Sequence, residues 1–303
     1  WYENQFVLPD TTYGQGDEQV IYQCEVLRKN LFETRGSLES WRDNVSRLSS
    51  GNSRLMFAIS CAFAGPLLKP TGVESGGFHF TGNSSSGKST TINVASSVWG
   101  SPDFKRQWRA TDNALEAVAA AHSDTLLVLD ELGQADSRTV GDTAYMLANG
   151  AGRERMSSKV ALRPALRWRV LFISTGEQPL KDKMAEVGKK AHAGQELRVA
   201  DIPFAVEGGS GGFETIQGYG QAAEFAKALS SAAASDFGHA GRAAAPQFAH
   251  NIALRDDALH MFAILRDDHR PDAPGRQKLC RRRDGAARRD GDNRLFGLGF
   301  QDL

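Results

Sequence analysis

Gly82-Asn83-Ser84-Ser85-Ser86-Gly87-Lys88-Ser89-Thr90 is the stretch that decides the fold, because it matches the pattern GxxxxGK[ST] of a phosphate-binding loop. Residues 77–81 before it alternate and favour β structure, and residues 90–99 after it carry apolar side chains at helical spacing. A strand, such a loop and a helix N-terminus in succession predict a P-loop, whose backbone N–H groups and helix dipole would bind the phosphates of a nucleotide.

Individual residues of this loop have predicted roles. Gly82 and Gly87 let the backbone turn tightly, and Lys88 is expected to reach the β- and γ-phosphates and to act in catalysis. Ser89 would offer its hydroxyl to Mg²⁺. The alternative is a surface loop rich in glycine and serine, which the flanking elements and a second motif disfavour. The predicted nucleotide-binding residues of the loop are Gly82, Asn83, Ser84, Ser85, Ser86, Gly87, Lys88, Ser89 and Thr90.

The second motif is the apolar run Thr125–Leu129, which ends in the acids Asp130 and Glu131. A short aliphatic run is typical of a strand buried on both faces of a parallel sheet, and ligands bind at the carboxyl ends of such strands. Asp130 is therefore predicted to hold the shell of Mg²⁺ together with Ser89, and Glu131 to polarise the attacking water as general base. A strand that merely ends in two solvated acids is the alternative.

The composition restricts the class of protein. The 303 residues carry 36 Lys and Arg and 36 Asp and Glu, so any nucleic acid must bind to a local basic patch rather than to an overall basic surface. Cys24, Cys61 and Cys280 form no CxxC pair, which indicates a reducing, cytoplasmic environment and argues against a metal site. No apolar run is long enough to span a membrane. A start at Trp1 rather than Met predicts a piece of a longer product.

The remaining pattern predicts an α/β fold with a parallel sheet. Ser37 and Asp112 are the expected N-caps of two helices, and Ser174, or Thr175 beside it, is predicted to contact the γ-phosphate or its water. The order of strands and helices is that of P-loop ATPases with an additional catalytic glutamate, including AAA+ proteins and superfamily 3 helicases. Further strands are expected at 19–25, 107–111, 166–174 and 196–203, and further helices at 38–48, 53–64, 112–122, 137–148, 178–190 and 220–234.

Four segments are expected along the chain: an N-terminal α+β segment (1–72) that packs on the core, a P-loop ATPase core (73–207), a C-terminal helical segment (208–254) and an Arg/Asp-rich tail (255–303). Gly208–Gly212 is expected to be a flexible turn or linker. The tail should form little core and be disordered. A basic nucleic-acid-binding tail and a shifted reading frame are the alternatives.

Several further segments carry a resemblance to a known family. They are Gly51–Leu55, Ala62–Leu68, Glu74–His79, the phosphate-binding loop, Val98–Gly100, Ala110–Glu116 and Ala193–Arg198. Over roughly residues 5 to 250 the chain resembles the domain-of-unknown-function 927 family, whose members occur in phages, plasmids and integrative elements and are taken to be helicase-like ATPases, often beside primase domains. After about His250 the expected C-terminal helices of that family are not recognisable.

The resemblance implies ATP and Mg²⁺ as cofactors and a hexameric ring with ATP at the subunit interfaces, where an arginine of the neighbouring subunit completes the site. Arg155 or Arg153 is the candidate, and Arg198 is a candidate second sensor of the phosphates. A solvated arginine pair at a helix end is the alternative. Lys159 and Arg163 are expected on a hairpin tip that faces the central channel and follows the phosphates of DNA.

Together these features predict an ATP-hydrolysing, helicase-like motor that acts on single-stranded DNA in the replication of a mobile element or phage. Two other functions share the same nucleotide motifs: an AAA-like ATPase that remodels a protein partner, and a non-catalytic, nucleotide-dependent assembly module. A nucleotide kinase fits less well, because no lid or acceptor pocket stands out in the sequence.

Overall fold

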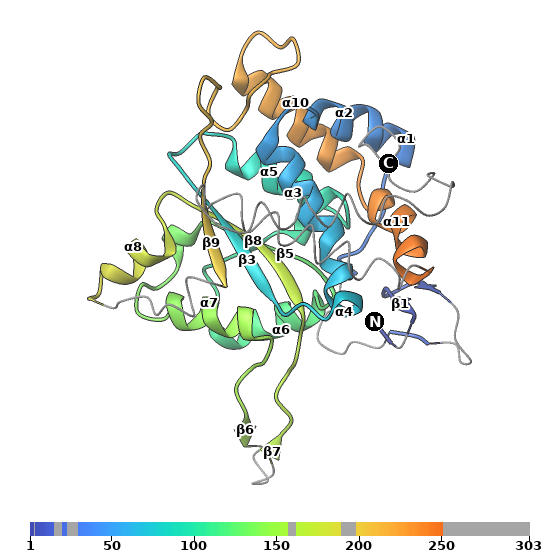
Figure 1. Ribbon diagram of the computed structural model, residues 1–303, viewed down its shortest axis with the longest axis vertical. Coiled ribbons are helices and arrows are strands. Elements are labelled where there is room, and N and C mark those ends of the chain that lie inside the picture. Colours follow the sequence, from blue (N-terminus) through green and yellow to red (C-terminus); the bar gives the residue numbers. More distant parts are fainter. Residues whose placement is uncertain (3, 15–19, 23–29, 157–161, 189–197, 251–303) are drawn as a thin grey trace, which may run out of the picture. The chain divides into compact units, whose positions relative to one another are not determined.

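The computed structural model describes residues 1–2, 4–14, 20–22, 30–156, 162–188 and 198–250 (Figure 1). Residues 1–252 form one compact unit. At its centre is a five-stranded parallel sheet in the order β4-β5-β8-β3-β9, so the prediction of an α/β fold with a parallel sheet is confirmed. The strands are β3 (Gly76–Thr81), β4 (Arg106–Gln107), β5 (Thr125–Asp130), β8 (Val170–Gly176) and β9 (Val199–Pro203).

The topology brings the predicted motifs to one edge of the sheet. Strand β8 lies between β3, which precedes the glycine-rich loop, and β5, which ends in the two acids. Thr81 pairs with Gly176 and Leu129 with Ser174, so the carboxyl ends of these three strands are aligned. Ligands of parallel α/β sheets bind outside this edge.

Helices cover both faces of the sheet (Figure 1). Every residue of β5 is buried, as expected for a central strand packed on both sides. The helices on one face are α3 (Ser53–Ala64) and α5 (Lys88–Ser97), with α10 (Ala222–Ser235) packed on α5; on the other face lie α6 (Asp112–Ala121), α7 (Val140–Asn149) and α8 (Leu180–Ala185).

The remaining elements are short, apart from the helix at 239–250, which lies within the C-terminal segment (208–254) that the sequence predicted to be helical. Ser37 caps α1 as predicted, because its Oγ accepts a hydrogen bond from the N–H of Ser40 at 3.1 Å. The elements outside the central sheet and its covering helices are β1 (Phe6–Val7), β2 (Thr12–Tyr13), α1 (Leu38–Trp41), the π-helical turn η1 (Arg42–Ser46), α2 (Arg47–Ser49), the 3₁₀ turns η2 (Gly65–Leu67), η3 (Pro102–Phe104) and η4 (Leu132–Gln134), α4 (Leu68–Thr71), β6 (Arg155–Met156), β7 (Leu162–Arg163) and α11 (His239–His250).

Several predicted boundaries are wrong. The N-cap of α6 is Thr111 rather than Asp112: Thr111 has an extended backbone and its side chain accepts from the N–H of Ala114. Helix α7 begins three residues later than expected, because the Asp136 carboxylate accepts the N–H of Arg138 in a turn before it. Val20–Tyr22 form no strand. The other residues of the strand expected at 19–25 lie outside the described residues.

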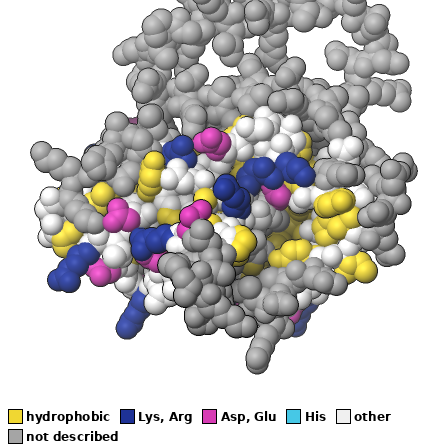
Figure 2. Space-filling model, turned by 90° about the horizontal axis from the view of Figure 1, so that it is seen from below, with side chains coloured by type: hydrophobic (Ala, Val, Ile, Leu, Met, Phe, Trp, Pro, Cys, Tyr) yellow, Lys and Arg dark blue, Asp and Glu magenta, His cyan; other side chains and the backbone are white. Residues whose placement is uncertain are grey.

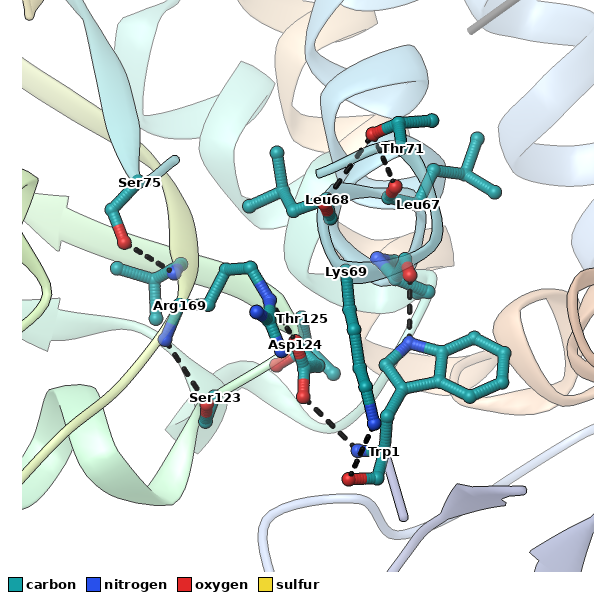
Figure 3. Close-up of polar contacts among 12 residues, drawn as sticks. Trp1, Leu67, Leu68, Lys69, Thr71, Ser75, Ser123, Asp124, Thr125 and Arg169 are labelled. Atoms are coloured by element: carbon teal, nitrogen blue, oxygen red, sulfur yellow. Dashed lines mark hydrogen bonds and ion pairs between the residues drawn. The ribbon is translucent and has the colours of Figure 1, made fainter. Parts of the chain in front are cut away.

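Asp124, the residue before β5, ties the first residue of the chain to the amino ends of the central strands (Figure 3). Its Oδ2 pairs with the amino group of Trp1 at 3.0 Å, and its Oδ1 accepts from Nε of Arg169 at 2.7 Å. The indole of Trp1 donates to the carbonyl oxygen of Pro66 at 2.7 Å. Both side-chain oxygens of this mostly buried carboxylate therefore have a cationic partner.

In the part of the chain that the structure describes, no helix has the length and apolar character that crossing a membrane requires.

Candidate active site

The loop between β3 and α5 has the backbone of an anion-binding turn. Ser85 and Gly87 have φ values of 61° and 103°, in the left-handed region, and Gly87 stands directly before the first residue of α5. A side chain at Gly87 would also approach the ring of Phe213 to 2.6 Å, so only glycine fits there. A turn of this kind that leads into a helix N-terminus favours a negatively charged ligand.

Lys88 lies inside this loop. Its Nζ donates to the carbonyl oxygens of Gly82 at 2.5 Å and Asn83 at 2.7 Å, and only 8% of the residue is exposed. Burial lowers the pKa of Lys88, and three nearby carboxylates oppose this effect by stabilising its charged form. The aligned carboxyl ends of β3 and β5 place the predicted catalytic lysine and the acids of the second motif at the same edge of the sheet. These carboxylates belong to Glu177, Glu131 and Asp130.

The glycine-rich segment Gly208–Gly212, for which the sequence predicted a flexible turn or linker, forms turns and packs against the loop. The N–H of Gly212 donates to the carbonyl oxygen of Ser86 at 3.0 Å, and a Cβ at Gly211 would lie 2.5 Å from that oxygen. Phe213, with 2% of its surface exposed, covers Gly87. The glycines allow two backbones to approach each other closely. The composition of the segment alone does not distinguish this packing role from that of a flexible linker.

The two acids are held by Thr175 at the end of β8. Its hydroxyl donates to Oδ1 of Asp130 at 2.6 Å and accepts the backbone N–H of Glu131 at 3.2 Å. Glu131 has a φ of 62°, a conformation that costs a residue other than glycine about 1–2 kcal/mol. Such strain is typical of functional positions, where surrounding contacts hold it in place.

Ser174, the residue chosen from the sequence as the γ-phosphate contact, is engaged elsewhere. Its Oγ accepts from Nε1 of Trp108 at 2.7 Å and bonds Nδ1 of His79 at 2.8 Å. The other ring nitrogen of His79 lies 3.1 Å from the carbonyl oxygen of Gln178, which can only accept, so Nε2 carries the proton and Ser174 donates to Nδ1. The buried Ser174 hydroxyl is thus used within the protein, and Thr175 is the residue that meets the acids.

His79 joins the strand before the loop to this buried network. The pKa of His79 is lowered from 6.5 to about 4, mainly by burial and also by the nearby charge of Lys88, while the hydrogen bond to Gln178 opposes the shift. Because the folded protein binds this proton less readily than the unfolded chain, the contribution of His79 to stability is complete above about pH 6.5 and decreases as the pH falls towards 4.

The other predicted binding residues lie on the loop and the first turn of α5. Asn83, Ser84, Ser85 and Ser89 are exposed, whereas Thr90 is mostly buried and its Oγ1 accepts from Ser230 at 3.3 Å. Among the described residues, no group of three or more His, Cys, Asp or Glu side chains could hold a metal ion. A hydroxyl and one carboxylate, as offered by Ser89 and Asp130, suit Mg²⁺, which keeps several waters and binds with substrate phosphates.

The structure does not bring Arg198 to the loop. The carbonyl oxygen of Arg198 accepts the N–H of Gly77, at the amino end of β3, whereas the loop follows its carboxyl end. The guanidinium donates to the side-chain oxygen of Asn149 at 2.6 Å and pairs with Glu74 at 3.3 Å. With a rise of about 3.3 Å per strand residue, the length of β3 separates Arg198 from the phosphate loop of its own chain.

Arg153 and Arg155 belong to the connection between α7 and β8. Arg153 pairs with Asp112 in the first turn of α6 at 3.3 Å, and its N–H donates to Glu116. Its side chain is 65% exposed, so this ion pair contributes little to stability. Arg155 lies in β6, opposite Arg163 in β7. Among the interactions of the described residues, Arg153 has no contact with the glycine-rich loop, so the role of Arg153 or Arg155 in a neighbour's site stays a prediction.

We expect Thr175→Val to lower the free energy of unfolding by about 1–3 kcal/mol, because Asp130 and the N–H of Glu131 lose a buried partner. Turnover of the nucleotide should fall as well, and Thr175→Ser should retain both properties. Thr143→Val is the matched control, since the buried Thr143 hydroxyl donates to Asp112 at 2.8 Å, away from the loop. Chemical denaturation and phosphate release measure the two effects; equal turnover in both valine variants would contradict the role of Thr175.

The fold and the site define a class: a mixed α/β protein in which a glycine-rich loop with a buried lysine lies beside two acids at the carboxyl edge of a parallel sheet. The chain belongs to the family described as "Domain of unknown function (DUF927)", whose model matches residues 1–166. The family expected from the sequence is thereby confirmed over residues 1–166, whereas the resemblance was expected over roughly residues 5 to 250.

A solved structure described as "SCCmec type IV Cch - active helicase" has a similar fold, with a TM-score of 0.65 and 22% sequence identity. The match covers 89% of this chain and 49% of the other, so the chain spans about half the length of that protein. Two structures of NtrX from Brucella abortus, one in complex with ATP, have TM-scores of 0.28 and 0.29 at 14% identity; the matches cover 43% and 57% of this chain and 32% and 37% of theirs. No curated protein matches the chain in sequence.

Three residues near the site escaped the sequence analysis. Lys105 pairs with Asp130, Glu177 acts on Lys88, and Phe213 covers Gly87. Of these three, only Glu177 could have been predicted from the sequence, because it follows a strand that ends at the same edge of the sheet. The other two come from segments whose sequences show no nucleotide motif.

Proposed function

We propose that the chain is a P-loop ATPase with an additional catalytic glutamate, of the AAA+ and superfamily 3 helicase type, and that it acts as a motor on single-stranded DNA. The observation that carries the proposal is the topology: the loop with Lys88 follows β3 and the acids Asp130 and Glu131 lie at the end of β5, on either side of β8 at the same edge of the sheet, with Thr175 bonded to both acids. The position of β8 between β3 and β5 supports the proposal, because one strand separates the P-loop strand from the acidic strand in that class.

The residues of the site suit the chemistry of ATP hydrolysis. The loop and the N-terminus of α5 would bind the phosphates, and Lys88 would exchange the carbonyl oxygens of Gly82 and Asn83 for phosphate oxygens. Ser89 and Asp130 would hold Mg²⁺, which neutralises charge on the phosphates when bound. Glu131 would take the proton of the attacking water, with its backbone fixed by Thr175.

The hairpin β6–β7 is the proposed contact with DNA. It projects away from the sheet, and its register places Arg155 opposite Arg163 (Figure 1). Like charges directly opposite each other destabilise a strand pair, so two arginines at these positions favour a negatively charged ligand. On the face viewed from below, Lys and Arg side chains gather near the middle, with Asp and Glu beside several of them (Figure 2). Lys159, the other residue predicted for the tip, lies outside the described residues.

For the double variant Arg155→Ala/Arg163→Ala we expect weaker binding of single-stranded DNA and a smaller salt dependence. Each lost phosphate contact reduces the slope of log K against log salt by about 0.7, so the slope should fall by about 1.4. Titration of a fluorescent oligonucleotide at several salt concentrations measures both quantities. Lys227→Ala, on the exposed side of α10, is the control for net charge; an unchanged slope in the double variant would rule out the hairpin as the DNA contact.

The wider biological setting is also a proposal. Family membership, together with the fold shared with a protein described as an active helicase, supports a role in the replication of a mobile element or phage. We propose a cytoplasmic, hexameric ring that binds ATP at its subunit interfaces and works beside a primase domain or partner. The neighbour's fold at 22% identity supports the architecture, and the function itself needs the experiment below.

Steady-state ATPase activity of the purified chain, with and without single-stranded DNA, tests the proposal. Lys88→Ala provides the blank, because it removes the buried ammonium from the loop. Turnover above the blank that DNA stimulates is the expected result. Turnover that DNA leaves unchanged would favour the remodelling of a protein partner, and no turnover above the blank would indicate a nucleotide-dependent assembly module.

A further inference from the structure

Lys105 is bonded to the carboxylate on which the proposed Mg²⁺ site depends. Its Nζ lies 3.0 Å from Oδ2 of Asp130, and the side chains of the two residues are 23% and 11% exposed. The other oxygen, Oδ1, accepts the hydroxyl of Thr175 at 2.6 Å. Both oxygens of Asp130 are therefore engaged by donors of the protein, and Lys88 is not one of them, because its ammonium is bonded to loop carbonyls.

The backbone places Lys105 beside Asp130 at the edge strand of the sheet. Lys105 ends the turn η3, directly after the fully buried Phe104, and it precedes β4. In β4, Gln107 pairs with Asp130 itself. The ring of Phe104 packs edge-on against His122, with centroids 4.8 Å apart, which fixes the turn. The ammonium thus reaches Asp130 from a firmly held backbone through a flexible side chain.

A mostly buried carboxylate needs a partner of opposite charge, and Lys105 supplies it. The water ligands of Mg²⁺ would need the same lone pairs of Asp130, and the ion would repel the ammonium beside it. Because Thr175 holds Oδ1, the oxygen that can change partners is Oδ2.

We propose that Lys105 competes with Mg²⁺ for Asp130 and thereby sets the Mg²⁺ concentration at which the site binds nucleotide tightly. This inference rests on the proposed function, since it requires Asp130 to face bound Mg²⁺ and nucleotide. In this arrangement Lys105 is a positioning residue: it holds the carboxylate in place and gives way when the ion arrives with the phosphates.

The test is the affinity for the fluorescent analogue mant-ATP, measured over a series of free Mg²⁺ concentrations. Lys105→Gln should lower the Mg²⁺ concentration for half-maximal tightening about tenfold, the change that about 1.4 kcal/mol produces. Lys105→Arg keeps the charge and should behave like the wild type, as should Lys227→Gln, the control at an exposed position of α10. An unchanged or higher Mg²⁺ requirement in Lys105→Gln would overturn the competition.

Thermal unfolding in EDTA without nucleotide gives an independent readout. Lys105→Gln should lower Tm, because Asp130 loses its charged partner, and the double variant Lys105→Gln/Asp130→Asn should recover most of the loss. A lower Tm with an unchanged Mg²⁺ requirement would identify a purely structural ion pair. If the wild type bound no mant-ATP at any Mg²⁺ concentration, the proposed function would fall, and the role of Lys105 with it.

Discussion

Glu131→Gln is expected to lower ATP turnover by about 10²–10⁴-fold and to leave nucleotide binding intact, because the amide cannot accept the proton of the attacking water. Glutamine keeps the size of the side chain and the same backbone demands as glutamate. The contact between the backbone N–H of Glu131 and Thr175, and the φ of 62°, should therefore persist. Phosphate release and mant-ATP binding, measured on the same preparation, separate the two properties.

Glu177→Gln is the matched control for this experiment. Glu177 lies just after β8 at the same edge of the sheet, and its carboxylate also acts on the charge of Lys88. The side chain of Glu177 is exposed. At the end of the preceding strand, β8, it is Thr175 that bonds Asp130. We expect a change in turnover of a few-fold at most. A larger loss in Glu177→Gln than in Glu131→Gln would reassign the general base to Glu177.

The central motifs could be predicted from the sequence because each is encoded locally. The loop pattern, the alternation before it and the helical spacing after it lie within 25 residues of one another, and the structure forms β3, the turn and α5 at these positions. The acids after the aliphatic run end β5 for the same reason. Parallel sheets then bring such carboxyl ends together without any further signal.

Contacts between distant segments could not be predicted, since nothing local encodes them. The choice between Ser174 and Thr175 depended on which face of the sheet meets the acids, and it was decided by Trp108, which directly follows β4, and by His79 in β3. The glycines at 208–212 have the composition of a linker, yet their lack of side chains lets Gly212 reach Ser86. No sequence pattern indicated the ion pair of Lys105, because its partner, at the end of β5, lies 25 positions further along the chain.

The arginines show the same limit at the level of an assembly. The sequence made Arg198 a candidate phosphate sensor. However, Arg198 precedes β9 and so lies at the amino edge of the sheet, where its guanidinium is bonded to Asn149 and Glu74. The guanidinium of Arg153 pairs with Asp112 in an exposed ion pair that an incoming nucleotide of a neighbouring subunit could replace at little cost. Of the three arginines, Arg153 is therefore the one we propose as the neighbour's arginine, and we propose that Arg155 acts with Arg163 in the hairpin.

Arg153→Ala is accordingly expected to reduce turnover by about 10³–10⁵-fold, the effect of losing an arginine that stabilises charge on the transferred phosphate. Binding of mant-ATP by the isolated subunit should change little, because the loop and Lys88 are untouched. The matched variant is Arg155→Ala, which should weaken DNA binding more than turnover measured without DNA.

Mixing two inactive variants decides whether the arginine acts between subunits. Arg153→Ala subunits keep an intact loop, and Lys88→Ala subunits keep an intact Arg153, so a mixed ring of the proposed kind would contain some interfaces with both groups. We expect ATPase activity to return in the mixture and to depend on the mixing ratio. If the mixture stays as inactive as its components while the rings exchange subunits, Arg153 acts within its own chain, through Asp112 and Glu116, and stabilises the fold of α6 instead.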